Sequence, residues 1–268
     1  MRWNSKNGVV PIDDTEMSYV SFGQGKKNLI LLPGLSDGLM TVRGKAALLA
    51  KPYRAFFDKY TVYMFSRKDK LPEGCTIREM AADQARAMKT LGIKTASVMG
   101  VSQGGMIAQY FAIDYPEMIE KLIIAVSAPR ANAVVRTCVK KWMRYAESGD
   151  HKRLMIDTAE KGYSPEYLKK YRRIYPIIGA IGKPSDYTRF LISARAILGF
   201  DAYDELGRIA CPTLILGGAE DLTVGVQASY EMHERIAGSE LYVYPGLGHA
   251  AYEEAKDFNQ RVLDFLEK

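Results

Sequence analysis

The sequence predicts an α/β fold, in which a mostly parallel, open sheet has helices on both faces. Two observations carry this prediction: short apolar runs recur along the chain, and segments with helical spacing separate them. A continuous apolar run is typical of a strand that is buried on both faces, as strands of parallel sheets are. Strands that alternate with helices are joined by right-handed crossovers. The 268 residues are enough for one such domain, or for one domain with an insertion.

The first part of the chain, residues 1–132, contains four apolar runs that we interpret as strands. One run ends at Pro33-Gly34 and another ends at Gly100, and both sequences favour a turn directly after a strand. Because none of the runs alternates with polar residues, each suits a strand that is covered on both faces. The runs are residues 29–32, 61–65, 96–99 and 122–126.

A helix is predicted between the second and third runs. Thr76 and Glu79 have the spacing of a capping box, in which each side chain accepts a hydrogen bond from the backbone of the other residue. Gly92 supplies a signal for the end of the helix. The apolar residues in between lie mostly on one helical face, and they are Ile77, Met80, Ala81, Met88 and Leu91.

Strand patterns are absent from residues 133–205, which we interpret as several short helices. The segment contains ten of the 28 aromatic residues, and its 14 basic and 9 acidic residues give it an excess of five positive charges. A helical, aromatic and basic insertion is typical of a cap and not of another sheet layer. Glycine or proline interrupts the helical pattern at Gly149, Gly162, Pro165, Pro176, Gly182 and Pro184.

The last part of the chain, residues 206–268, restores the alternation of strands and helices. We predict strands at 212–218 and 240–244, a helix at 226–236 and a closing helix at 252–266. The chain therefore divides into a core made of residues 1–132 and 206–268 and a helical cap of residues 133–205.

The composition excludes several classes of protein. Its 47% apolar and 25% charged residues exclude disorder and collagen-like structure. No apolar run reaches the roughly 20 residues of a membrane helix, and the first eight residues hold no apolar stretch, so we expect neither a membrane partner nor a secretory signal. Three widely spaced cysteines exclude a disulfide framework and a cysteine-based zinc site. They favour a reducing compartment, so we expect a cytoplasmic protein.

The formal net charge of +6 raises the question of nucleic-acid binding, because most of the excess lies in residues 133–205. Acidic residues are interleaved there and no nucleic-acid motif accompanies the basic residues. We therefore expect a solvated helical surface and no nucleic-acid partner. Steering of an anionic substrate, such as a carboxylate-bearing ester or enol lactone, is an alternative use of the same charge.

The most specific motif is Gly100-Val101-Ser102-Gln103-Gly104, a G-x-S-x-G sequence between a predicted strand and a predicted helix over residues 103–114. This setting is that of a nucleophile elbow. The tight turn strains the serine backbone and requires small neighbours, which Gly100 and Gly104 supply. It also exposes the Ser102 hydroxyl and places the N–H of Gln103 at a helix start, where it can bind a developing oxyanion.

A serine nucleophile needs a base and an acid that orients the base. His249, in Gly248-His249-Ala250, follows a predicted strand, whereas His151 resembles a solvated turn residue and His233 lies on an exposed helical face. Asp221 directly follows the strand at 212–218, where a carboxylate can fix the tautomer of His249. The adjacent Glu220 is the alternative acid.

A second oxyanion donor is expected from the turn after an early strand. The turn is Leu32-Pro33-Gly34-Leu35-Ser36-Asp37-Gly38, and its candidate donor is the backbone N–H of Leu35.

Together these motifs resemble the α/β-hydrolase superfamily over nearly the whole chain. The resemblance covers the turn at Pro33-Gly34, the elbow around Ser102, and the chain order Ser102, Asp221, His249. The family usually has His-Gly in the oxyanion turn, and this chain has Pro33-Gly34 instead. Many members carry a helical cap between the sixth and seventh core strands. The resemblance thus implies that residues 133–205 roof the site and select the substrate.

The motifs and the resemblance predict a serine hydrolase that cleaves an ester, or a similar acyl bond such as a lactone or thioester, of a small molecule. Ser102 attacks, His249 transfers the proton, Asp221 orients His249, and no metal or organic cofactor is needed. The enzyme alternatives are a C–C bond hydrolase, an acyltransferase, a perhydrolase and an aminopeptidase. A ligand receptor without turnover on the same fold is an alternative of a different class. As oligomeric state, a monomer or a homodimer is expected.

Overall fold

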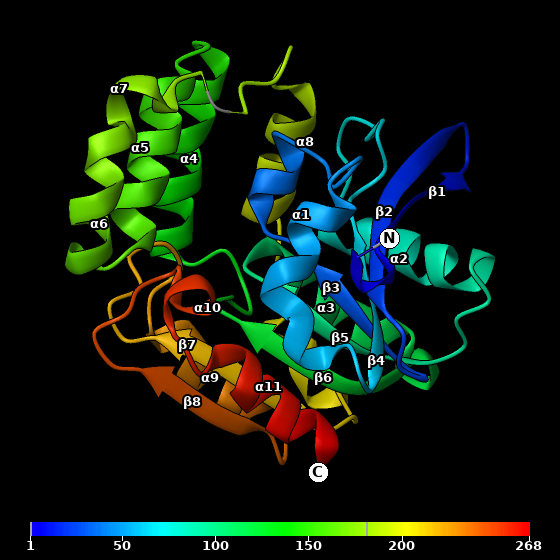
Figure 1. Cartoon of the computed structure of the whole chain (residues 1–268). Coiled ribbons are helices and arrows are strands. Elements are labelled where there is room, and N and C mark those ends of the chain that lie inside the picture. Colours follow the sequence, from blue (N-terminus) through cyan, green and yellow to red (C-terminus); the bar gives the residue numbers. More distant parts are fainter. Residues whose placement is uncertain (1, 181) are drawn as a thin grey trace.

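The computed structural model describes residues 2–180 and 182–268 and contains an eight-stranded sheet with helices on both faces (Figure 1). The strand order is β1-β2-β4-β3-β5-β6-β7-β8, and all pairs from β4 to β8 are parallel. The mostly parallel, open sheet that the sequence predicts is confirmed. The strands are β1 (Lys6–Ile12), β2 (Thr15–Gly23), β3 (Lys27–Leu32), β4 (Tyr60–Phe65), β5 (Ala96–Val101), β6 (Ile119–Ala125), β7 (Thr213–Gly218) and β8 (Glu240–Tyr244).

An antiparallel hairpin of β1 and β2 adds two strands that the apolar runs do not reveal. β1 pairs with β2, and β2 pairs with β4. Both strands mix polar with apolar residues, and Pro11 in β1 is tolerated because the outer side of an edge strand needs no N–H donor. The hairpin lies on the far side of the molecule from α5 and α6 (Figure 1).

Two hydrophobic cores flank the sheet, one on each face. On one face α2 and α3 contribute Met80, Met88 and Phe111. On the other face α11 contributes Val262 and Phe265. The helices of the core are α1 (Ala46–Ala50), α2 (Ile77–Thr90), α3 (Gln103–Asp114), α9 (Gln227–Arg235), α10 (Ala251–Glu254) and α11 (Phe258–Glu267).

Local signals set the starts of the helices that flank the sheet. The capping box predicted for α2 is present, because the Glu79 N–H donates to Thr76 Oγ1 (3.1 Å) and the Thr76 N–H donates to Glu79 Oε2 (2.7 Å). The helix predicted at residues 103–114 coincides with α3.

The prediction of one closing helix at 252–266 is wrong, because the chain forms two helices there. Ala255 adopts extended backbone angles (φ −73°, ψ 115°) and ends α10. Glu254 accepts a hydrogen bond from the N–H of Ser164 (2.8 Å), which attaches α10 to the helices of residues 133–205. In contrast, α11 packs against the sheet.

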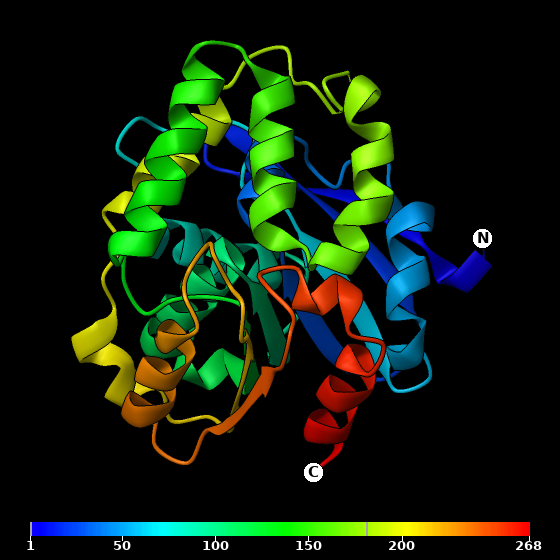
Figure 2. The same ribbon diagram turned by 90° about the vertical axis from the view of Figure 1, so that its left-hand side faces the viewer.

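Residues 133–205, which we call the helical segment, connect β6 to β7. Its described residues contain no strand. In Figures 1 and 2, α4, α5 and α6 stand beyond the carboxyl ends of β6, β7 and β8. The helices are α4 (Ala133–Glu147), α5 (His151–Gly162), α6 (Pro165–Tyr171), α7 (Tyr175–Ile178) and α8 (Thr188–Leu198).

The two ends of the helical segment lie side by side in a short neck. Arg130 and Asp201 form an isolated antiparallel bridge. On either side of this bridge, the N–H of Ala131 donates to the carbonyl of Phe200 (2.9 Å) and the N–H of Ala202 donates to the carbonyl of Pro129 (2.9 Å). The chain therefore leaves the sheet and returns to it at almost the same place.

The prediction of a solvated turn at His151 is wrong, whereas His233 is exposed as expected. His151 is the first residue of α5 and is only 2% exposed. Asp150 caps α5 by accepting a hydrogen bond from the N–H of Arg153 (3.0 Å), and the His151 ring lies 6.1 Å from the ring of Tyr187. The helix start thus directs this imidazole into the helical segment and not into solvent.

Candidate active site

Ser102 lies at a sharp turn between β5 and α3. Its backbone angles are φ 55° and ψ −119°, a conformation that is strained for a residue with a side chain. The N–H of Ser102 donates to the carbonyl of Ala125 at the end of β6 (2.9 Å), which ties the turn to the neighbouring strand. The backbone therefore has the geometry of a nucleophile elbow.

Two glycines allow the strand and the helix to meet at this turn. A Cβ atom on Gly104 would lie well under 3.0 Å from the carbonyl oxygen of Leu32, and one on Gly100 would lie well under 3.0 Å from the carbonyl oxygen of Gly104. All of these partners are backbone atoms, so no side-chain rotation relieves the clash.

We expect Gly104→Ala to lower the free energy of unfolding by about 3 kcal/mol, the upper part of the range for overpacked sites. Chemical denaturation measures this loss. Gly199→Ala is the matched control, because its added Cβ meets only ordinary contacts of 3.9 Å. Equal stability of the two variants would contradict the close approach of α3 and β3.

His249 connects Ser102 to Asp221 through two hydrogen bonds. Its Nε2 lies 2.9 Å from Ser102 Oγ, and its Nδ1 lies 2.8 Å from Asp221 Oδ2. The three side chains come from three different strand ends, namely those of β5, β7 and β8. The side chain of Glu220, the alternative acid, is exposed. The structure thus brings together Ser102, Asp221 and His249.

Asp221 is held as a carboxylate by its surroundings. Its Oδ1 accepts hydrogen bonds from the N–H groups of Thr223 (2.7 Å) and Val224 (2.9 Å). Burial opposes the charge, but the nearby His249 and these two N–H donors outweigh burial and lower the pKa of Asp221. Both carboxylate oxygens therefore accept hydrogen bonds, and His249 is oriented by a charged partner.

The two expected oxyanion donors are helix-start N–H groups beside Ser102. Leu35 is the first residue of the 3-10 helix η2 (Leu35–Gly38), and Gln103 is the first residue of α3. The first N–H groups of a helix have no partner within the helix. A Cβ atom on Gly34, the residue before Leu35, would lie 3.3 Å from Ser102 Cβ, so the turn passes directly over the serine.

Three charged residues behind this turn are absent from the sequence prediction. Arg67 follows β4 and is 2% exposed, Asp37 belongs to η2 and is equally buried, and Arg189 comes from α8. Asp37 Oδ2 accepts hydrogen bonds from the backbone N–H of Arg67 (3.0 Å) and from Arg189 Nη2 (2.6 Å). Arg67 comes two residues after the end of β4, and nothing in the sequence distinguishes it from an ordinary surface charge.

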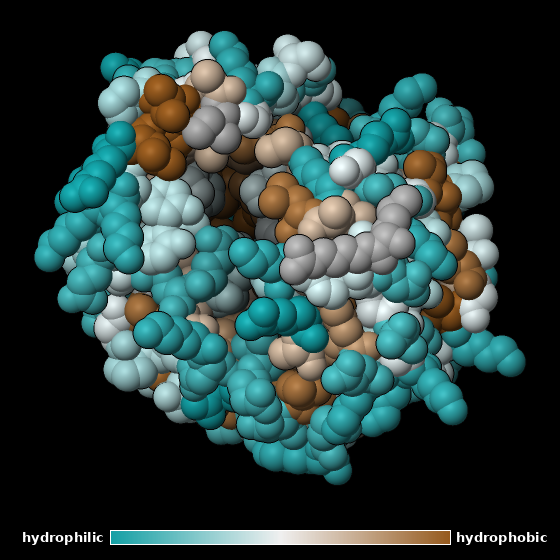
Figure 3. All heavy atoms as spheres, viewed as in Figure 1, coloured by the Kyte–Doolittle hydropathy of each residue, from teal (hydrophilic) through white to brown (hydrophobic). Residues whose placement is uncertain are grey.

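Two small cavities adjoin the turn at Gly34. One has a volume of about 230 Å³, and the other has about 80 Å³. Figure 3 shows a hollow with hydrophobic residues at its depth between the helical segment and the core. The larger cavity of the pair has no charged side chain in its lining, which includes Leu35, Leu39, Trp142, Leu154, Thr158 and Phe190.

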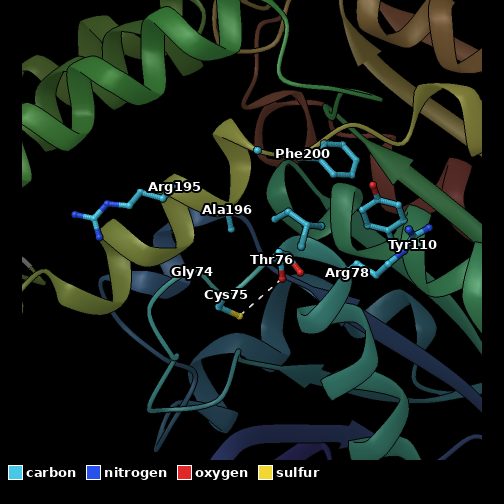
Figure 4. Close-up of a pocket in the computed structure, with 10 residues that line it drawn as sticks. Gly74, Cys75, Thr76, Arg78, Tyr110, Arg195, Ala196 and Phe200 are labelled. Carbon is cyan, nitrogen blue, oxygen red and sulfur yellow. Dashed lines mark hydrogen bonds between the residues drawn. The ribbon is translucent and has the colours of Figure 1, made fainter.

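A cavity of about 370 Å³ lies elsewhere, between α2, α3 and α8 (Figure 4). Its lining includes Thr76, Arg78, Tyr110 and Arg195, and none of the three hydrogen-bonded residues of the candidate site. Arg78 pairs with Asp114 and Glu205 and stacks on Tyr110, so its charge is already compensated.

Among residues 2–180 and 182–268, no group of three or more His, Cys, Asp and Glu side chains is placed to hold a metal ion. No helix of these residues is both long and apolar enough to cross a membrane.

Comparisons with known proteins agree with this architecture. The hydrolase for 2-hydroxy-6-oxononadienedioate and 2-hydroxy-6-oxononatrienedioate from a Pseudomonas species is 30% identical over 67% of this chain, and the match spans 65% of that relative, just under two thirds of its length. A Caulobacter protein named as a carbamate hydrolase, RutD, is 24% identical over 90% of this chain and 91% of its own.

Solved structures share the fold at low sequence identity. An alpha/beta hydrolase from a Medee basin deep-sea metagenome matches with a TM-score of 0.85 and 20% identity, over 97% of this chain and 98% of that one. The enol-lactonase of Burkholderia xenovorans matches with a TM-score of 0.77 and 21% identity, over 97% and 100%. A family model for the alpha/beta hydrolase fold matches residues 28–256. The chain therefore belongs to the alpha/beta hydrolase fold family.

Proposed function

We propose that this protein is a serine hydrolase that cleaves an ester or lactone of a small molecule. The observation that carries the proposal is the unbroken chain of hydrogen bonds from Asp221 through His249 to Ser102, whose hydroxyl stands on a strained turn. A histidine base between a serine and a buried carboxylate is the arrangement that activates a serine for acyl transfer.

The reaction follows from the position of each group. Ser102 Oγ attacks the substrate carbonyl while His249 Nε2 takes its proton, and Asp221 stabilises the resulting imidazolium. The N–H groups of Leu35 and Gln103 receive the oxyanion. His249 then protonates the leaving alcohol. In the second half of the reaction His249 takes a proton from water while the water oxygen attacks the acyl carbonyl. His249 then returns the proton to Ser102 Oγ as the acid leaves.

The cavity of about 230 Å³ supports a substrate with a small apolar part. It lies against Leu35, the proposed oxyanion donor, and its lining carries no charged side chain. Several basic residues of the helical segment are paired with acids, as Arg172 is with Glu160 and Arg195 is with Glu73. We therefore favour an uncharged ester or lactone over the anionic alternative. In this proposal residues 133–205 form a cap that is inserted into a core of residues 1–132 and 206–268.

Labelling with a fluorophosphonate, followed by intact mass spectrometry, tests the proposal. We expect one adduct on the wild type and none on Ser102→Ala. A panel of p-nitrophenyl esters then sizes the site. Because each buried methylene contributes about 0.8 kcal/mol, kcat/KM should rise about fourfold per methylene until the cavity is full, and then fall. A folded wild type without an adduct and without turnover would contradict the proposal and favour a receptor.

A second candidate is hydrolysis of a carbon–carbon bond. The 30% identical Pseudomonas relative, named as a hydrolase of a 2-hydroxy-6-oxo dicarboxylic acid, favours it. The two carboxylate ends of such a compound would have to enter cavities near the site, one of which is lined without charged side chains. Turnover of a 2-hydroxy-6-oxo-dienoate at a higher kcat/KM than every ester of the panel would favour this candidate.

A further inference from the structure

The buried side chain of Arg67 contacts both places that carry a proposed oxyanion donor: the turn at Gly34, just before Leu35, and the side chain of Gln103. Its Nη2 donates to the carbonyl oxygen of Gly34 (2.8 Å) and to Gln103 Oε1. Gln103 is fully buried, and its Nε2 donates to the carbonyl oxygen of Ser193 in α8 (2.8 Å). The guanidinium of Arg67 therefore bridges the turn at Gly34 and the first residue of α3.

The bond to Gly34 fixes the direction of the Leu35 N–H. The carbonyl of Gly34 and the N–H of Leu35 belong to the same peptide unit, which is planar and has its C=O and N–H on opposite sides. A guanidinium that holds the carbonyl on one side therefore holds the N–H on the other. Otherwise this carbonyl accepts only the N–H of Asp37, at 3.2 Å, among the described residues.

The surroundings keep Arg67 charged and in place. Burial lowers the pKa of Arg67 to about 10, although Asp37 opposes the effect, so the guanidinium stays charged at neutral pH. Arg67 Nη1 lies 3.4 Å from Asp37 Oδ2, which Arg189 also contacts. Burial opposes the charge on Asp37, but the two arginines outweigh it and lower its pKa. Two cations share one anion, so the cluster has a net positive charge next to the turn.

We propose that Arg67 is a positioning residue: it presets the Leu35 N–H and holds the side chain of Gln103, the residue that carries the second donor. Arg189, which comes from α8 and shares Asp37 with Arg67, supports this arrangement from the helical segment. This inference rests on the proposed serine hydrolase function. A guanidinium suits this role, because it is planar and can donate to two acceptors at fixed angles.

The test compares Arg67→Met and Arg67→Lys with the wild type. Loss of one oxyanion donor lowers kcat by about 10² to 10³-fold. We expect Arg67→Met to show a loss of this size with KM within threefold of the wild type. Binding of a trifluoromethyl ketone, which forms a tetrahedral adduct, should weaken by the same factor as kcat. The kcat of Arg67→Lys should lie between those of Arg67→Met and the wild type, because an ammonium keeps the charge but not the planar donor geometry.

Asp83→Asn is the matched control for a disturbed buried charge. Asp83, in α2, is 3% exposed and pairs with Lys68 and Arg86. Among the described residues it makes no hydrogen bond or ion pair with Gly34, Arg67 or Gln103. We expect it to lower stability and to leave kcat and ketone binding near wild-type values. The side chain of Arg189 is partly exposed. We expect Arg189→Met to lower kcat and ketone affinity by about tenfold each, with KM nearly unchanged. This variant replaces the Arg67 variants in the test if those do not fold.

The outcomes separate this inference from the proposed function. If the wild type is labelled at Ser102 but folded Arg67→Met retains its kcat and its ketone affinity, Arg67 does not position the donors. An equal loss of kcat in Asp83→Asn, or a loss confined to KM, overturns the inference as well. A wild type that shows no labelling and no turnover overturns the proposed function, and the inference falls with it.

Discussion

Ser102→Ala is expected to lower kcat by about 10⁵ to 10⁶-fold on any ester that the wild type cleaves, because no other group replaces the attacking oxygen. His249→Ala should have an effect of similar size, since its Nε2, 2.9 Å from Ser102 Oγ, is the only base in contact with the serine among the described residues. Both variants should keep the fold, because neither side chain fills a hydrophobic core. Steady-state kinetics and thermal unfolding on purified protein measure both expectations.

The matched controls are a second serine and a second histidine. Ser97 is a buried serine of the same strand, β5, and His233 is an exposed histidine. Ser97→Ala and His233→Ala should each retain kcat within a few-fold. Substantial activity in pure Ser102→Ala or His249→Ala would remove the proposed nucleophile or base.

Asp221→Asn is expected to lower kcat by about 10⁴-fold. The amide oxygen can replace Oδ1 as acceptor for the N–H groups of Thr223 and Val224, which leaves the NH₂ group facing His249 Nδ1. The NH₂ group is a donor, so Nδ1 must accept and the proton moves to Nε2. A protonated Nε2 cannot take the proton of Ser102.

Glu220→Gln is the control for the acid, because it changes the neighbouring, exposed carboxylate by the same amide substitution. We expect a kcat within a few-fold of the wild type. The reverse pattern, with Glu220→Gln inactive and Asp221→Asn active, would mean that the loop after β7 adopts another arrangement in the working enzyme. Kinetics of both variants on one ester decide between the two carboxylates.

The sequence predicts those parts of the fold that depend on local signals. The strand at 96–99, the turn at Ser102 and the helix at 103–114 form one motif, and each of its parts agrees with the structure. The hairpin of β1 and β2 lacks a continuous apolar run. β1 is a partly buried edge strand, and β2, although mostly buried, includes polar residues such as Ser18 and Ser21. The break at Ala255 in the closing helix depends on a contact with Ser164, some 90 residues away, and has no local signal.

The same distinction applies to the candidate site. Ser102, Asp221 and His249 each follow a strand, and parallel strands bring their carboxyl ends to one edge, so their proximity is predictable. Arg67, Asp37 and Arg189 come from three separate stretches of chain, and each resembles an ordinary surface charge in the sequence. Their burial results from tertiary packing of the helical segment, which single-residue patterns do not encode.

The neck at Arg130 and Asp201 has a consequence for chain entropy. Strands β6 and β7 pair although about 90 residues separate Leu122 from Thr213, and closing a flexible loop of that length is unfavourable. The neck divides this closure into the short connections 126–130 and 201–212 and a helical excursion that the neck itself closes. Since loop entropy grows only logarithmically, doubling the length of the excursion would cost about 0.6 kcal/mol. We therefore expect changes in the length of the excursion to leave the strand pairing of the sheet unchanged.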